Sequence, residues 1–114
     1  MTLFRLFLAT CLIVVMAYTM VTIANHGLNL LPIFFGDMAA MAWPGQFNLD
    51  FFCFLLLSGL WTAWRHHFSA GGCALGVAMT LLGFPLLAAY LLIASVKTNG
   101  DIKAMMLGEA RAKA

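Results

Sequence analysis

Asp50 is the residue of this sequence best placed to do chemistry, because it lies near the start of a long apolar run, Phe47 to Arg65. A charged side chain within a membrane span costs about 2.5–3.5 kcal/mol at mid-bilayer on insertion scales, and such residues usually mark a proton, ion or ligand site. Asp50 lies about one helical turn inside the run, where this cost is smaller. It is therefore either such a site, or a side chain that ties the preceding segment to the helices through hydrogen bonds.

Two further ionisable residues, His26 and Asp37, are expected on the same side of a membrane as Asp50, because both lie between the first apolar run and this one. A histidine pKa lies near neutrality, so a His–Asp pair at this place would respond to pH. We predict Asp50, Asp37 and His26 as candidates for a binding or proton site.

His66 and His67 directly follow the run and invite comparison with ligands of haem or a chlorophyll-type pigment. Adjacent residues on a helix point about 100° apart, so the two rings cannot face one metal from one helix face. We interpret both as side chains that reach the membrane surface beside Arg65. We predict no cofactor, with haem or a chlorophyll-type pigment at His66 or His67 as the alternative.

No set of residues typical of catalysis is present. The sequence lacks a nucleophile–base set, a phosphate-binding loop and an HExxH-type metal motif. Its three cysteines are isolated and show no CxxC or Cys/His spacing, which argues against a disulfide framework or a zinc site. We therefore predict no catalytic residue, no metal site and no enzymatic activity.

The composition indicates that the bilayer is the solvent of this chain. Hydrophobic residues make up 64% and charged residues 9% of 114 residues, whereas soluble domains have about 45–50% apolar and about 25% charged residues. So few charges cannot cover a surface in water. The net charge of +2 is too weak to indicate nucleic acid. The chain has room for one membrane domain, residues 1–100, and a short amphipathic tail, residues 101–114, with Asp101 as a helix N-cap.

The apolar runs predict an all-α fold, an integral membrane bundle of three transmembrane helices at about 6–24, 47–64 and 73–96. The first run of 19 residues corresponds to roughly 28 Å of helix, close to the ~30 Å hydrocarbon core. Residues 30–43 form a run that is short for a span and is flanked by Pro, Gly and Trp. We predict an interfacial or re-entrant helix there, and four spans are the alternative.

Small residues predict where helices approach one another closely in lipid. Gly72, Gly76, Thr80 and Gly83 share one face of the third predicted span, and Thr10, Ala17 and Ala24 recur every seven residues in the first. Three helices with two such faces have more packing surface than they can satisfy among themselves. The expected partners are therefore the lipid bilayer and other membrane protein subunits or further copies of this chain, and not nucleic acid.

Four short motifs resemble a family of small bacterial inner-membrane proteins of unknown function, over roughly residues 6–95. They are His26-Gly27-Leu28-Asn29-Leu30, Asn48-Leu49-Asp50-Phe51-Phe52, Trp64-Arg65 and Gly83-Phe84-Pro85-Leu86-Leu87. The resemblance implies about three membrane helices, with an aromatic-aspartate motif opening the central one, and implies no activity. In that family the turn after the central span is richer in Arg and Lys than Arg65-His66-His67. This pattern favours a cytoplasmic N-terminus, although three spans divide the basic residues between the two sides.

The sequence therefore predicts a multi-pass protein of the bacterial inner membrane that is not an enzyme. The leading hypothesis is an accessory or scaffolding subunit of a larger membrane complex, or a homo-oligomer, which associates through its small-residue faces. The alternative hypothesis is a protein that binds or transports a small solute, a proton, a lipid or a pigment and uses Asp50.

Overall fold

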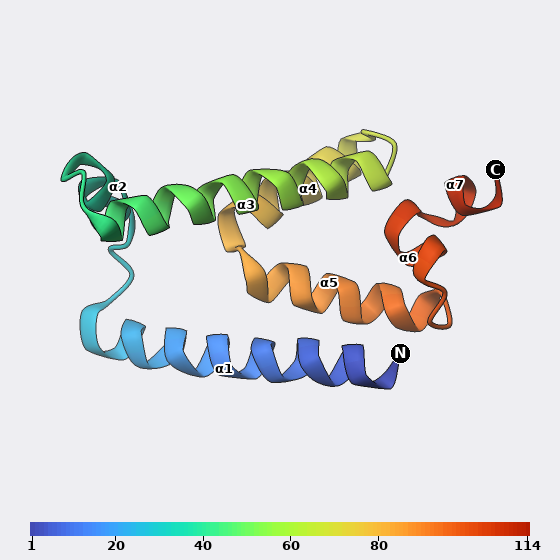
Figure 1. Cartoon of the computed structure of the whole chain (residues 1–114), viewed down its shortest axis with the longest axis horizontal. Coiled ribbons are helices and arrows are strands. Elements are labelled where there is room, and N and C mark those ends of the chain that lie inside the picture. The colour runs from blue at the N-terminus through green and yellow to red at the C-terminus, as the bar shows by residue number, and fades with distance from the viewer.

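The computed structural model describes all 114 residues and contains helices but no strand, so the predicted all-α class is confirmed (Figure 1). The molecule is elongated, with principal extents of 48 × 28 × 23 Å. Its helices are α1 (Thr2–His26), α2 (Leu31–Ala39), α3 (Trp43–Arg65), α4 (Ala70–Leu82), α5 (Phe84–Lys97), α6 (Ile102–Leu107) and α7 (Glu109–Lys113).

Two of these helices, α1 and α3, are long and apolar enough to cross a membrane. They have 25 and 23 residues, which correspond to roughly 37 and 34 Å, and they contain the predicted spans 6–24 and 47–64. The helix α3 begins at Trp43, earlier than Phe47, because Pro44 occupies its first turn. Proline is favourable there, since the amide that it lacks would have no partner within the helix.

Between them, the predicted segment 30–43 contains the short helix α2, which packs against the first part of α3. Pro32 lies in its first turn. Its nine residues correspond to roughly 13 Å, less than half of a hydrocarbon core of ~30 Å, so α2 cannot cross a bilayer by itself.

The predicted third span, 73–96, is not one helix. It is divided at Gly83 into α4 and α5, which have 13 and 14 residues. Gly83 has φ 74° and ψ −149°, a backbone conformation that is essentially restricted to glycine. Pro85 then fits the first turn of the new helix α5. The helix α4 packs along α3, and α5 reverses direction and packs along α1 (Figure 1). A three-span bundle is therefore not confirmed.

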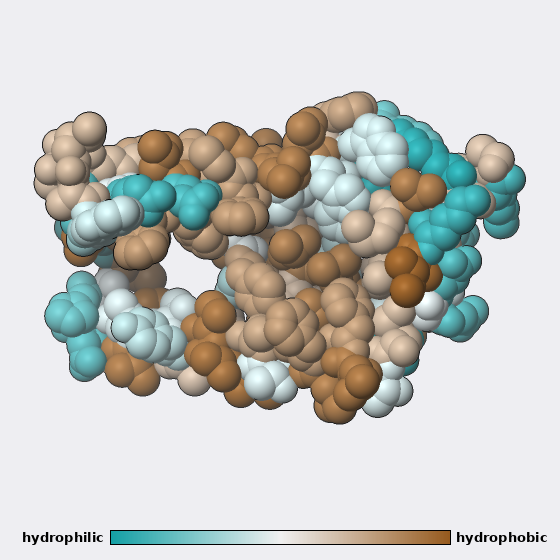
Figure 2. Space-filling model, in the orientation of Figure 1, coloured by the Kyte–Doolittle hydropathy of each residue, from teal (hydrophilic) through white to brown (hydrophobic).

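The reversal brings both termini to the same end of the molecule (Figure 1). Arg5 of α1 donates from Nε to Ser95 Oγ and from a terminal nitrogen to the Ser95 carbonyl of α5, both at 3.0 Å. The six Lys and Arg residues of the chain all lie at this end, which we call the basic end: Arg5, Arg65, Lys97, Lys103, Arg111 and Lys113. The opposite end, at α2, carries none. Hydrophilic residues gather at the two ends, and apolar ones cover much of the length between them (Figure 2).

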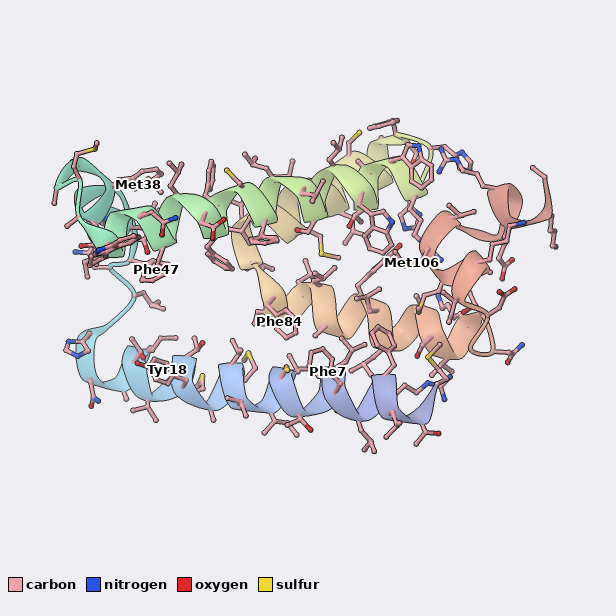
Figure 3. The ribbon with its side chains drawn as sticks, in the orientation of Figure 1. Phe7, Tyr18, Met38, Phe47, Phe84 and Met106 are labelled. Carbon is pink, nitrogen blue, oxygen red and sulfur yellow. The ribbon has the colours of Figure 1, made fainter.

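The two long helices are held apart rather than packed on each other. The helix α1 packs mainly on α5, and α3 packs mainly on α4 and α2. Because α5 begins midway along the molecule, it fills the space between α1 and α3 only toward the basic end (Figure 1). Beyond its first residues, Figure 2 shows an opening between α1 and α3 that side chains do not fill. Tyr18 of α1 and Phe47 of α3 lie on its two sides (Figure 3).

Candidate functional site

Asp50 lies on α3 seven residues after Trp43, roughly 10 Å along the helix axis. Its side chain is exposed and makes no hydrogen bond. At about 100° per residue, Asp50 points away from the face on which the buried Gly59 and Ala63 of α3 lie. The structure therefore shows no contact through which Asp50 would tether the preceding segment.

The tether between α2 and α3 is made by Asp37 instead. Asn48 donates from Nδ2 to Asp37 Oδ2 at 3.3 Å and to the Phe34 carbonyl at 3.1 Å. Gly45 allows the two helices to meet there, because a Cβ at this position would collide with the Asp37 carbonyl. Asp37 thus has a structural role at the end opposite the basic end.

The third predicted member of this site, His26, is the last residue of α1. It is exposed and makes no side-chain hydrogen bond. No group of three or more His, Cys, Asp or Glu side chains lies close enough to hold a metal ion. The structure therefore does not bring His26, Asp37 and Asp50 together as a metal-type cluster, and it leaves Asp50 as an isolated carboxylate on α3.

At the basic end, three polar side chains form one hydrogen-bonded group. Arg65 donates to the Tyr90 hydroxyl at 2.8 Å, and His66 Nε2 lies 2.6 Å from the same hydroxyl. Since that hydroxyl accepts from Arg65, its own proton is available to a neutral His66 ring. Partial burial lowers the pKa of His66, and the charges of Arg65 and His67 lower it further. The lowered pKa favours the neutral ring, which can accept the Tyr90 proton at Nε2.

This group also holds the C-terminal tail. Arg65 donates to the Met105 carbonyl at 2.7 Å and to the Ala104 carbonyl at 3.3 Å, and both carbonyls lie in the last turn of α6. Trp61 Nε1 donates to the Met106 carbonyl at 2.9 Å. The Met105 and Met106 carbonyls have no other partner at this helix end, whereas the Ala104 carbonyl also accepts from the Gly108 amide at 2.9 Å. Asp101 caps the other end of α6, as predicted, by accepting from the Lys103 amide at 3.1 Å.

A second cation strengthens this attachment. The Arg111 guanidinium lies 4.0 Å from the centre of the Trp64 ring and donates to the Trp64 carbonyl. His67 lies beside this region in a turn, exposed, with φ 59°. His66 and His67 were the two candidate cofactor ligands. His66 is hydrogen-bonded to Tyr90 of the same chain, and His67 makes no side-chain hydrogen bond.

The predicted packing face of Gly72, Gly76, Thr80 and Gly83 lies against α3 of the same chain. A Cβ at Gly76 would lie 2.6 Å from the Gly59 carbonyl oxygen, and a Cβ at Gly59 would lie 2.6 Å from that of Gly76. Thr80 Oγ1 shares its one proton between the Gly76 and Leu55 carbonyls, at 3.1 and 3.4 Å. This face is therefore occupied within the chain. The other small-residue seam, Thr10, Ala17 and Ala24, is exposed.

An apolar groove of about 600 Å³ lies between α3 and α5. Its walls are Phe51, Phe54, Leu55, Leu57, Ser58 and Trp61 of α3 with Phe84, Leu87 and Leu91 of α5, and Gly83 at the bend, Phe4 and Met106 complete it. This groove is not among the features predicted from the sequence. The spacing of Phe54, Leu57 and Trp61 carries a signal for it, because residues three and four apart share one helix face.

Comparisons with known proteins add no assignment: no protein-family model matches the sequence, and no curated protein or solved structure shows significant similarity to it. The resemblance to the small inner-membrane family stays a prediction from its four motifs. The function is therefore argued from the geometry of the chain.

Proposed function

We propose that the protein is a non-catalytic, multi-pass protein of the bacterial inner membrane that acts as an accessory or scaffolding subunit of a larger membrane complex. The observation that carries the proposal is the uncovered face of α3, which borders the apolar groove and the opening between α1 and α3. In a bilayer, an apolar helix face of this kind is covered either by lipid acyl chains or by a packed helix.

The exposed apolar surface supports a membrane location. Phe47, Phe54 and Leu57 of α3 have 64%, 64% and 61% of their surface exposed. Large contiguous apolar surfaces of this kind mark contacts with membranes or with other proteins. Because hydrophilic residues gather at the two ends of the molecule (Figure 2), α1 and α3 are suited to cross the bilayer, with α4 and α5 entering it and returning.

The distribution of charge supports a cytoplasmic N-terminus. Three successive spans that each cross the membrane would divide the basic residues between its two sides. The bend at Gly83 is instead consistent with all six Lys and Arg residues on one side. The positive-inside rule assigns such a side to the cytoplasm. Both termini are then cytoplasmic, and α2 lies at the opposite surface.

The surface proposed for association differs from the small-residue face that was predicted from the sequence. Gly76 and Thr80 are used by α3 and Gly72 by the turn after α3, so they are not free for a partner. The groove and the neighbouring face of α3 take their place in the proposal. A homo-oligomer remains the second form of this association.

A second candidate function, binding or transport of a small solute, proton, lipid or pigment, is favoured by one observation. Asp50 is exposed on an apolar helix and has no partner. Replacing Asp50 by Asn separates the two functions: a solute or proton site loses activity while the fold survives, whereas a subunit keeps its complex at reduced affinity.

The experiment that tests the leading proposal is gentle purification of the tagged protein from its native membrane, followed by mass spectrometry. We expect a membrane complex at fixed stoichiometry. Leu57→Trp fills the groove and should release the complex, whereas the matched Leu56→Trp, at an exposed position outside the groove lining, should retain it. A protein that is monomeric in mild detergent and in native membranes, without a partner, would refute the proposal.

A further inference from the structure

We propose that one transmembrane helix of a different membrane protein binds along α3, and that a basic side chain of that helix pairs with Asp50. This inference rests on the proposed function and specifies its partner. The surface concerned consists of Phe47, Asp50, Phe54, Leu57 and Trp61, which we call the α3 stripe.

The α3 stripe has the spacing of a helix-packing seam. Its residues follow one another at intervals of three, four, three and four positions, the heptad pattern by which one helix inserts side chains between those of another. They lie on one face of α3 over roughly 21 Å, most of a hydrocarbon core of ~30 Å. The α3 stripe is therefore long enough to accompany a partner helix through most of a membrane.

The stripe is uncovered within the chain except at Trp61, which is half-buried against Tyr90 and donates to the Met106 carbonyl. Phe47, Phe54 and Leu57 are exposed, while the face of α3 toward α4 is the one that buries Gly59 and Ala63. Leu87 and Leu91 of α5 line the second wall of the groove. A helix seated there would touch α3 and α5 together near the basic end, and α3 alone where the opening between α1 and α3 begins (Figure 2).

Asp50 determines what kind of helix fits. It is the one charged residue of the α3 stripe, and no side chain of this chain bonds it. Ionisable residues at membrane depth typically pair with a residue of opposite charge or with backbone groups in a helix interface. Acyl chains would fill the groove but would leave the carboxylate unpaired. A Lys or Arg side chain on the incoming helix would satisfy it and fix the register of that helix.

A second copy of this chain is a poor occupant of the stripe. Copies in one membrane share an orientation, so a symmetric pair along the stripe would place the two Asp50 carboxylates at the same depth. Like charges so placed repel each other. The chain offers no Lys or Arg there to compensate, because all six lie at the basic end. The charge of the stripe thus indicates a partner of another sequence.

The test is photocrosslinking in the native membrane. Benzoylphenylalanine replaces Leu57 in the stripe or, as the matched control, Leu56 outside the groove lining, and adducts are identified by mass spectrometry. We expect a protein adduct from position 57 but not from position 56, in a membrane helix of another protein that carries Lys or Arg. Asp50→Asn should lower the adduct yield about tenfold or more, because it leaves that cation unpaired. Asp50→Lys should abolish it, and an acidic residue at the partner's cation should restore it.

Each contrary outcome has a distinct meaning. An adduct with a second copy overturns this inference but leaves association as the function. A protein adduct whose yield is unchanged by Asp50→Asn and Asp50→Lys overturns the charge pairing. It leaves association with another protein as the function. Adducts with lipid only, or no adduct, overturn both proposals. Because Asp50 is exposed and unbonded, the two variants should unfold like the wild type in detergent, which shows that a lost adduct is not a lost fold.

Discussion

Replacing Gly59 by Ala should destabilise the chain, because Gly59 and Gly76 bring α3 and α4 into backbone contact. A Cβ at Gly59 would lie 2.6 Å from the Gly76 carbonyl oxygen, whereas ordinary van der Waals contact begins at 3.4 Å. The two helices would have to separate by roughly 0.8 Å. A gap of this size removes a quarter to a half of each dispersion contact across the interface, and the strain of overpacking typically costs about 1–3 kcal/mol.

The cost has a second contribution from a hydrogen bond. Thr80 Oγ1 donates to the Leu55 carbonyl of α3 across the same contact, at 3.4 Å, and separation would lengthen this bond. Such bonds between membrane helices contribute about 0.6 kcal/mol on average. We therefore expect Gly59→Ala to lower the free energy of unfolding by about 1–3 kcal/mol, with the larger part from packing.

The assay is reversible unfolding in mixed micelles of mild detergent and dodecyl sulfate, followed by tryptophan fluorescence. The matched control is Gly71→Ala in α4, where an added Cβ meets no atom within 4 Å, so its effect should stay within about 0.5 kcal/mol. Gly59→Ala and Gly76→Ala together should cost less than the two single changes combined, because the first already separates the helices. A Gly59→Ala variant as stable as Gly71→Ala would refute this helix contact.

Three further predictions test the remaining parts of the structure. Reporter fusions to the two termini should both report the cytoplasm, and a C-terminal fusion on the opposite side would show that α4 and α5 cross the membrane together. Gly83→Ala should cost about 1–3 kcal/mol in the same unfolding assay, because alanine resists φ 74°, and an unchanged stability would contradict the bend. Because the pKa of His66 is lowered in the fold, protons bind the unfolded chain first, so stability should fall as pH drops below 6.5. His66→Gln should remove this contribution in unfolding measurements, and His67→Gln should reduce it less, because burial is the largest cause of the lowered pKa.

The long helices could be predicted from sequence because apolar length determines them. The runs 6–24 and 47–64 lie inside α1 and α3, since hydrophobicity and a 1.5 Å rise per residue suffice to recognise a helix of membrane length. The break within 73–96 is invisible to this criterion, because the run is apolar on both sides of Gly83. The sequence Gly83-Phe84-Pro85 combines a glycine that ends a helix with a proline that suits the first turn of the next. Together they indicate a stop and a restart.

The candidate site was less predictable than the fold, because its contacts join residues distant in sequence. Asp37 was expected beside Asp50, but Asn48 bonds Asp37 and lies on another face of α3. The carbonyls that Arg65 holds belong to a tail about 40 residues later, and apolar periodicity contains no information about such a pairing. The α3 stripe was visible in the sequence as a heptad pattern, but its exposure follows from where α5 lies.

The bend at Gly83 and the attachment of the tail depend on each other. If α4 and α5 formed one straight helix along α3, Lys97 would lie toward α2, far from the basic end. Arg5 would then lose Ser95, and Arg65 would lose its three partners at Tyr90, Ala104 and Met105. Glycine adopts this conformation without a steric penalty, and the bend is stabilised by several charge-assisted hydrogen bonds, each of which contributes about 1.5–3 kcal/mol. The bend also directs α5 toward the basic end (Figure 1), so the groove that α5 forms with α3 lies beyond Asp50 and the carboxylate is open to a partner.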